Sequence, residues 1–186
     1  MSDRSKAAYA ELKECLYAEI LGSRRAFSWR RIIRNLVARP KTRFYFNLRL
    51  AHFLYTKGGR LNHFIAKHLQ RKNLKNYATD IGLATKIGAG LYLMHHPGVV
   101  IADHIKIGKN CVIRQNTTIG IKGKDFKRVI IGDNVTIGAN SCIIGDDIHV
   151  GDNVTIGAMS FVNCNIPQNS TFFTTKIKHL MPSSIN

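Results

Sequence analysis

The sequence has no uninterrupted apolar stretch of the roughly 18 residues that a membrane-spanning helix requires. Its first residues, Met-Ser-Asp-Arg-Ser-Lys, lack the apolar core of a signal peptide. The four cysteines show no CxxC spacing and no accompanying metal-ligand pattern; they are Cys15, Cys111, Cys142 and Cys164. We therefore expect a cytoplasmic protein with reduced thiols and no bound metal, either free or peripheral at the inner membrane face.

Acidic residues are also scarce, with 11 Asp and Glu against 28 Lys and Arg, and the imbalance is uneven. Residues 1–76 hold 18 basic and 4 acidic side chains, a net +14, whereas residues 77–186 hold 10 and 7, a net +3. Such asymmetry indicates an anionic partner, either a membrane surface or an acidic polymer, although a solvated helical surface is the plain alternative. No helix-turn-helix spacing, zinc pattern or aromatic RNA motif is visible, so we do not expect nucleic-acid binding.

The second half of the chain contains a six-residue repeat. From residue 81 an aliphatic residue recurs at nearly every sixth position, usually with glycine directly after it. Neither an amphipathic helix nor a half-buried strand predicts this spacing, whereas a fixed period of six indicates a parallel β-helix. The series is Ile81, Ile87, Leu93, Ile107, Ile113, Ile119, Ile131, Ile137, Ile144, Val150, Ile156 and Val162.

Each hexad is predicted to form one flat side of a triangular coil, so that three hexads complete a turn. Residues about 18 apart then stack at the spacing of paired strands. The aliphatic residue points into the core, and glycine or asparagine suits the tight corner. A small residue four places later is expected to point inward as well, namely Thr85, Cys111, Thr117, Val135, Ser141, Val154 or Ser160.

Residues 1–76 read as helices, which we expect over 5–22, 26–38, 42–56 and 60–73. The second of these places Trp29, Ile32, Ile33, Leu36 and Val37 on one face. A basic amphipathic helix of this kind lies in a membrane interface or, more often, packs against neighbouring helices or another subunit. We thus predict a mainly β fold with three parts: a basic helical segment at 1–76, a β-helix at 77–170 and a tail at 171–186.

The repeat breaks at two places, over 93–101, where two extra residues enter, and over 120–130, which should project as a loop. Functional sites are expected where a strong local pattern fails. The first break holds His95 and His96, and histidine is the natural general base near neutral pH. Asp80 precedes His95 by 15 residues, on the neighbouring rung, and is the candidate to fix the imidazole tautomer; a cap on the first coil is its alternative role.

These motifs resemble those of the serine acetyltransferase family within the hexapeptide-repeat acyltransferases. They are still more similar to the short capsule- and exopolysaccharide-associated relatives, such as the colanic acid acetyltransferase. The resemblance runs from about Arg49 to Ile166. It is carried by residues 49–55, 80–81, 86–88, 95–101 and 118–124, and by the paired Ile-Gly-Ala coils at 137–139 and 156–158.

The resemblance implies a left-handed β-helix that transfers acetyl directly from acetyl-CoA to a hydroxyl group. His95 would be the general base, with Asp80 as its partner in a catalytic dyad and His96 as the alternative base. The resemblance also implies a homotrimer with acetyl-CoA in a groove between two subunits, whether or not two trimers pair. The cofactor-binding positions that match are Gly120, Ile121, Lys122, Ala139 and Ala158, with Lys122, Lys124, Lys127 or Arg128 near the phosphates.

Some family positions differ here. Met94 stands where the serine acetyltransferases have an aspartate before the catalytic histidine, Lys127-Arg128 replace an Arg-His pair, and Arg39-Pro40 replace an Asp-Pro. Because those groups hold the amino acid acceptor, we expect the acceptor to be a sugar of a surface polysaccharide. The alternatives are serine O-acetylation in cysteine biosynthesis and a catalytically inactive trimeric scaffold. The family's C-terminal Gly-x-Pro-x-Arg is also missing at 174–178, which would alter some contacts with CoA.

Overall fold

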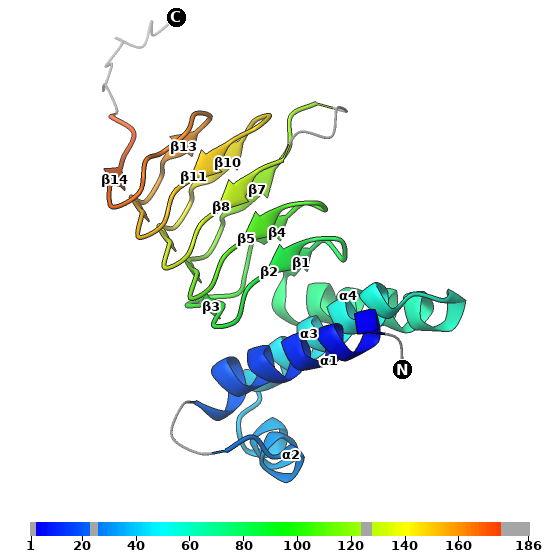
Figure 1. Ribbon diagram of the computed structural model, residues 1–186. Coiled ribbons are helices and arrows are strands. Elements are labelled where there is room, and N and C mark those ends of the chain that lie inside the picture. The colour runs from blue at the N-terminus through cyan, green and yellow to red at the C-terminus, as the bar shows by residue number, and fades with distance from the viewer. Residues whose placement is uncertain (1–2, 23–25, 124–127, 176–186) are drawn as a thin grey trace, which may run out of the picture.

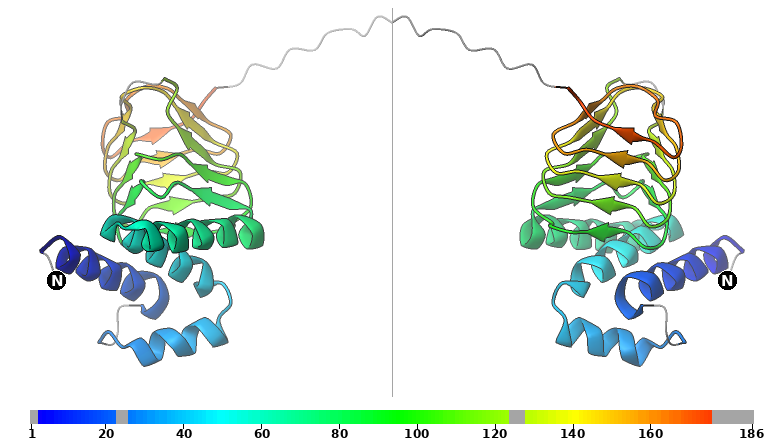
Figure 2. Two further views of the ribbon diagram at one scale, coloured as in Figure 1. Left: turned by 90° about the vertical axis from the view of Figure 1, so that its right-hand side faces the viewer. Right: turned by 90° about the vertical axis from the view of Figure 1, so that its left-hand side faces the viewer.

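The computed structural model describes residues 3–22, 26–123 and 128–175. In these segments a group of helices lies at one end of a triangular solenoid of short strands (Figure 1). The strands form three parallel sheets, which are the three sides of the solenoid (Figure 2). The predicted fold, a left-handed parallel β-helix preceded by a helical segment, is confirmed.

The helices follow the pattern expected from the sequence. Gly22, with φ of 69°, ends the first helix, and Gly58 and Gly59, with φ of 77° and 95°, separate the last two. Glycine adopts this left-handed region without steric strain. The last helix runs to Tyr77, four residues past its expected end. The bounds are α1 Asp3–Leu16, continued by the π-helical η1 Tyr17–Leu21, then α2 Trp29–Ala38, α3 Thr42–Lys57 and α4 Arg60–Tyr77.

The strands are two or three residues long because each side of the triangle ends at a corner. One sheet contains β1 Thr79–Ile81, β4 Val99–Ile101, β7 Thr118–Gly120, β10 Cys142–Ile144 and β13 Phe161–Val162. The second contains β2 Lys86–Ile87, β5 Lys106–Ile107, β8 Ile130–Ile131 and β11 His149–Val150. The third contains β3 Tyr92–Leu93, β6 Val112–Ile113, β9 Thr136–Ile137, β12 Thr155–Ile156 and β14 Thr171–Phe172, so the solenoid extends two residues past 170.

The aliphatic series forms the core of the solenoid, with one correction. Every member except Ile144 is buried, with a relative exposure of 3% or less. Ile143 takes the inward place, six residues after Ile137, while Ile144 points outward and pairs with Gly120. The prediction for Ile144 was wrong because an extra residue enters the corner before Val150, not the strand itself. The small residues expected four places later are all buried, as predicted.

The sheet of β1, β4, β7, β10 and β13 shows that every coil but one is longer than the predicted three hexads. Asp80 pairs with Val100, Val100 with Thr118, Thr118 with Cys142 and Cys142 with Phe161. The first coil therefore has two extra residues, the second matches the prediction, the third has a whole extra hexad and the fourth has a single extra residue. The additions enter at corners, where they leave the strand register intact. The third coil contains the projecting segment that the second break in the repeat predicted.

Asparagines form the corners between the sides. Their φ angles lie between 54° and 58°, a left-handed conformation that asparagine tolerates better than most residues. Four of the side-chain amides donate to the next asparagine along the solenoid, at 2.8–3.1 Å. One of these bonds joins Asn116 to Asn140, and the other three build a ladder. The members of this ladder are Asn110, Asn134, Asn153 and Asn169.

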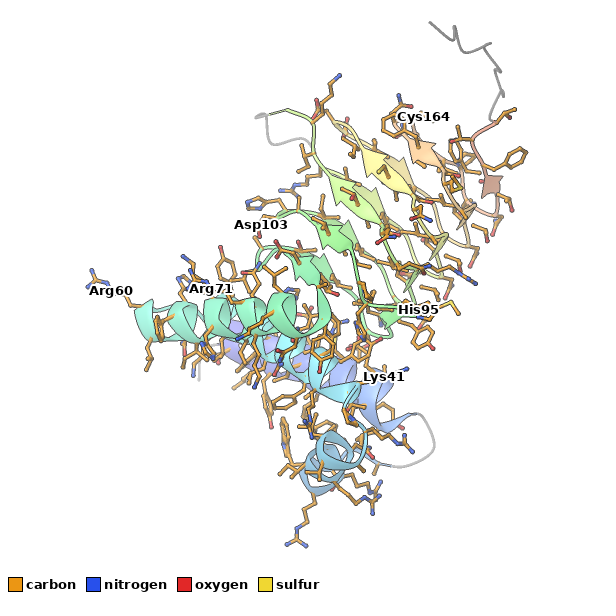
Figure 3. All side chains as sticks on the ribbon, turned by 180° about the vertical axis from the view of Figure 1, so that it is seen from behind. Lys41, Arg60, Arg71, His95, Asp103 and Cys164 are labelled. Carbon is orange, nitrogen blue, oxygen red and sulfur yellow. The ribbon has the colours of Figure 1, made fainter. Side chains whose placement is uncertain are left out.

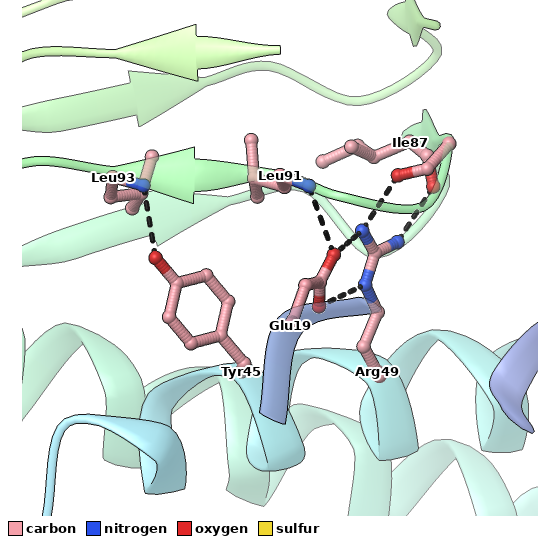
Figure 4. Close-up of polar contacts among 7 residues, drawn as sticks. Glu19, Tyr45, Arg49, Ile87, Leu91 and Leu93 are labelled. Carbon is pink, nitrogen blue, oxygen red and sulfur yellow. Dashed lines mark hydrogen bonds and ion pairs between the residues drawn. The ribbon is translucent and has the colours of Figure 1, made fainter. Parts of the chain in front are cut away.

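A buried ion pair joins the helices to the first coil (Figure 4). The Arg49 side chain on α3 binds Glu19 of η1, and the two side chains are 4% and 1% exposed. The Arg49 guanidinium also donates to the carbonyl oxygens of Ile87 and Gly88, at 2.6 and 2.8 Å. Glu19 in turn accepts the backbone N–H of Leu91 at 3.1 Å. The helical segment therefore satisfies the backbone groups that the open end of the solenoid would otherwise leave unpaired.

Candidate active site

His95 lies in the corner between β3 and β4, where the two extra residues enter the repeat. Backbone contacts from the first rung hold this corner. The Thr79 hydroxyl donates to the carbonyl oxygen of His96 at 2.7 Å, and the Gly98 N–H donates to that of Ala78 at 2.9 Å. The widened corner therefore projects from the solenoid but has a fixed backbone.

The exposed ring of His95 lines a cavity of about 500 Å³ between the solenoid and the helices. Lys41 enters from the loop before α3, and Lys75 and Tyr77 enter from the end of α4. Figure 3 shows His95 and Lys41 on the same side of the molecule, where the helical segment meets the first coil. Among the described residues that line this cavity none is Asp or Glu, so the two lysines make it electropositive.

His96 packs into an aromatic cluster. Its ring centroid lies 4.4 Å from that of Phe44, 5.1 Å from Tyr77 and 6.2 Å from Tyr45. Burial lowers the pKa of His96, and the positive charges of Lys41 and of a protonated His95 lower it further. Its Nδ1 is buried without a hydrogen-bond partner. His96 is therefore held neutral, and its ring contributes to the wall behind His95.

Asp80 lies on β1 and points out of the solenoid, half-buried under α4. Its Oδ1 accepts a hydrogen bond from Gln70 Nε2 at 3.1 Å, and the same Gln70 nitrogen donates to the Ile81 carbonyl at 3.0 Å. Because this coil is two residues longer than three hexads, Asp80 stacks against Val100, and His95 lies five residues before that position instead of three. No hydrogen bond or ion pair links Asp80 to His95 within the described part of the chain, so the dyad stays a prediction.

The register aligns two of the predicted cofactor residues with His95. The Asn116 N–H donates to the Pro97 carbonyl, Asn140 to Gln115 and Met159 to Ala139, at 3.0, 3.0 and 2.8 Å. The corner of His95 and the corners that carry Ala139 and Ala158 thus form one edge of the solenoid. This common edge follows from the repeat and offers small side chains above the histidine.

Gly120 is the last residue of β7, and Ile121 and Lys122 follow it. These three residues lie at the other edge of the sheet that contains β1, β4, β7, β10 and β13. A Cβ on Gly120 would meet no atom within 4 Å, and its φ is not positive. By contrast, a Cβ on Gly138 would lie 2.4 Å from the backbone nitrogen of Ala158. The fold therefore requires glycine at 138 but not at 120, and a glycine in a strand marks close approach by another group.

The remaining candidates are placed only in part. Arg128 is exposed, while Lys124 and Lys127 lie outside the described residues. His104 and His149 are exposed at the surface. No group of three or more His, Cys, Asp or Glu in the described segments is arranged to hold a metal ion. Sequence reasoning did not identify Lys41, Lys75 or Gln70, because helix packing alone brings them to this end of the solenoid.

Comparison with known proteins points to one group of relatives. Residues 128–166 match the family model "Hexapeptide repeat of succinyl-transferase". The chloroplastic serine acetyltransferase 1 of Arabidopsis thaliana is 37% identical over 100 residues, which are 53% of this chain and 31% of that protein. The chain thus spans less than half of the length of this relative.

Solved structures agree with this result. Serine acetyltransferase isoform 3 of Entamoeba histolytica, in complex with cysteine, superposes with a TM-score of 0.71 at 27% identity, over 96% of this chain and 62% of that one. The serine acetyltransferase of Brucella abortus strain S19, in complex with coenzyme A, gives 0.65 at 26%, over 92% and 65%. These relatives are serine acetyltransferases, so the comparisons support the broader resemblance and not the closer one to capsule enzymes.

Proposed function

We propose that this chain, whose repeat is that of the hexapeptide acyltransferases, is an O-acetyltransferase that moves acetyl from acetyl-CoA to a hydroxyl group. The observation that carries the proposal is the exposed His95 in a widened corner, facing a cavity of about 500 Å³ and sharing an edge with Ala139 and Ala158. Similarity to serine acetyltransferases, one of them a complex with coenzyme A, supports the same chemistry.

In the proposed reaction His95 accepts the proton of the acceptor hydroxyl while that oxygen attacks the thioester carbonyl. The carbon–sulfur bond then breaks, and the His95 imidazolium returns the proton to the departing thiolate. Asp80 would hold the imidazole in its productive tautomer, as carboxylates do in catalytic triads. His96, neutral and packed against Phe44, would keep the corner in place.

The acetyl-CoA site is proposed to lie between two subunits of a homotrimer. Ala139 and Ala158 lie at one edge of the sheet, whereas Gly120, Ile121 and Lys122 lie at the other. In a cyclic trimer each interface joins two different surfaces of identical chains. The edge with Gly120 on one copy would therefore meet the edge with Ala139 and Ala158 on the next. The open space beside Gly120 fits an extended chain such as pantetheine.

Serine is the acceptor that the relatives favour. A sugar acid is the second candidate, favoured by the cavity itself. Lys41 and Lys75 match a carboxylate on either molecule, but Met94 stands beside His95 and no described lining residue offers a carboxylate to the serine ammonium. An acceptor with a carboxylate and no amine therefore fits the described residues of the cavity better than serine does.

Substitution of Lys41 by glutamate tests the position of the acceptor. Both candidates carry a carboxylate, so we expect KM for the acceptor to rise about tenfold, while KM for acetyl-CoA stays unchanged; a charge pair near a surface is worth about this much. Lys106→Glu, on the far side of the solenoid, is the matched control. Release of free CoA thiol should be followed with serine, N-acetylserine, glucuronate oligomers and neutral glucose oligomers. If the protein releases no CoA thiol with any of these acceptors, the proposed function is refuted.

Substitution of Gly120 by leucine tests the acetyl-CoA site. A Cβ there would meet no atom within 4 Å, so we expect unchanged thermal unfolding and a KM for acetyl-CoA raised at least about tenfold. Gly138→Leu is the contrast, because its side chain would collide with the Ala158 backbone and destabilise the fold. Unchanged kinetics in a folded Gly120→Leu variant would contradict the placement.

A further inference from the structure

α2 uses one face to pack against the rest of the helical segment. Ile32 is fully buried and Leu36 is packed against the hydrophobic core. The Asn35 amide donates to the carbonyl oxygen of Ile20 at 3.2 Å. The side of α2 that carries Ile32, Asn35 and Leu36 is therefore covered by the rest of the chain.

The other residues of the apolar face predicted from the sequence form an exposed stripe directly beside this packed side. Trp29, Ile33 and Val37 are spaced by four residues, which places them in one line along a helix. Ile33 and Val37 are 60% and 72% exposed. Trp29 is 39% exposed, because its ring packs edge-on against Phe27 and its indole N–H donates to the Tyr9 hydroxyl at 3.3 Å. Figures 1 and 2 show α2 at the end of the molecule farthest from the solenoid.

Cations flank the stripe and acids are missing around it. Arg30 and Arg34 are exposed on α2 beside Ile33 and Val37. No Asp or Glu occurs between Glu19 and Asp80 in the sequence, so α2, α3 and α4 carry no acidic side chain at all. The surface around the stripe thus attracts anions and has no compensating charge from these helices.

We propose that α2 docks the protein on an anionic lipid membrane. Trp29, Ile33 and Val37 would enter the boundary between headgroups and acyl chains, and Arg30 and Arg34 would meet the lipid phosphates. This arrangement of a tryptophan-containing apolar line beside arginines is the one that binds helices flat on a bilayer. Within the described segments no helix is long and apolar enough to cross a membrane, so the contact is peripheral.

A second copy of the chain suits this surface less well. If α2 packed on α2 of another molecule, Arg30 and Arg34 of both copies would lie close together, and such like charges repel. A stripe of three side chains also falls well short of the roughly 1,200 Å² that a stable protein interface buries. Charge and size therefore both favour a lipid surface.

The chain carries its own probe, because Trp29 is its sole tryptophan. We expect its fluorescence to shift to the blue with vesicles of phosphatidylcholine containing phosphatidylglycerol, and not with phosphatidylcholine alone. Sedimentation with the vesicles should show the same preference and weaken with salt. Arg30→Gln with Arg34→Gln should lower the affinity by about tenfold or more.

The double variant Ile33→Ser with Val37→Ser should abolish the blue shift and the sedimentation. Its matched control is Leu61→Ser with Phe64→Ser on α4, since both side chains are 71% exposed and lie outside the proposed surface. Circular dichroism and thermal unfolding establish that all variants fold. Wild-type protein that ignores anionic vesicles, or serine variants that bind them normally, would overturn the proposal. So would light scattering showing that the stripe variant loses only an oligomer.

Discussion

Replacement of His95 by alanine is expected to lower the turnover of acetyl transfer by about 10²–10⁴, the usual contribution of a general base. The effect should fall on kcat, because the ring takes part in proton transfer and its exposed position contributes little to the fold. KM for acetyl-CoA should stay near its wild-type value. Thermal unfolding should also be unchanged, since the corner is held by backbone contacts from Thr79 and Gly98 that the substitution leaves intact.

Two other histidines make this experiment decisive. His96→Ala opens the aromatic cluster around Phe44 and is expected to destabilise the protein, with a smaller loss of turnover. His149→Gln changes an exposed histidine on β11 and should have no effect on either property. Normal activity in His95→Ala together with loss in a folded His96→Ala would transfer the role of base to His96.

The solenoid could be predicted from the sequence because each coil repeats one local requirement. Ile81, Ile87 and Leu93 already show the period of six, and the later members repeat it except at the first break, between Leu93 and Ile107, and at Ile144. The error at Ile144 arises from counting six residues back from Val150, whereas a count of six on from Ile137 gives Ile143, the residue that is buried. Pairing of Ile143 with Ile119 shows that the strands keep register while the corners absorb the difference.

The cavity beside His95 could be predicted only in part. The break in the repeat identified His95, because an interruption of the six-residue period can be recognised from the sequence alone. Lys41 and Tyr45 reach the same cavity through packing of α3 on the first coil, and no spacing in the sequence relates them to residue 95. The prediction that Asp80 partners His95 assumes a coil of three hexads, whereas the bond of Asp80 to Gln70 depends on how α4 packs on β1.

The ion pair of Arg49 and Glu19 left a weaker signal in the sequence. Arg49 is a single cation between Leu48 and Ala51, which face the core, and a buried cation needs a buried anion. Glu19 is the last acid before Asp80, so the choice of partners was small. The sequence contains this information, but only the fold shows that the pair also closes the end of the solenoid.

Substitution of Glu19 by glutamine is therefore expected to destabilise the protein by about 3–5 kcal/mol, the usual result of leaving one charge of a buried pair unmatched. Arg49→Met should have a similar effect, because it also strips the carbonyls of Ile87 and Gly88 of their donors. The two losses should not add in the double variant, since each single change already breaks the same network.

Urea unfolding of the wild-type protein, the two single variants and the double variant measures this coupling. Lys109→Gln, which breaks the exposed pair with Glu14, is the control and should leave stability nearly unchanged. If Glu19→Gln proved equally mild, the helices would be attached to the solenoid by apolar packing alone.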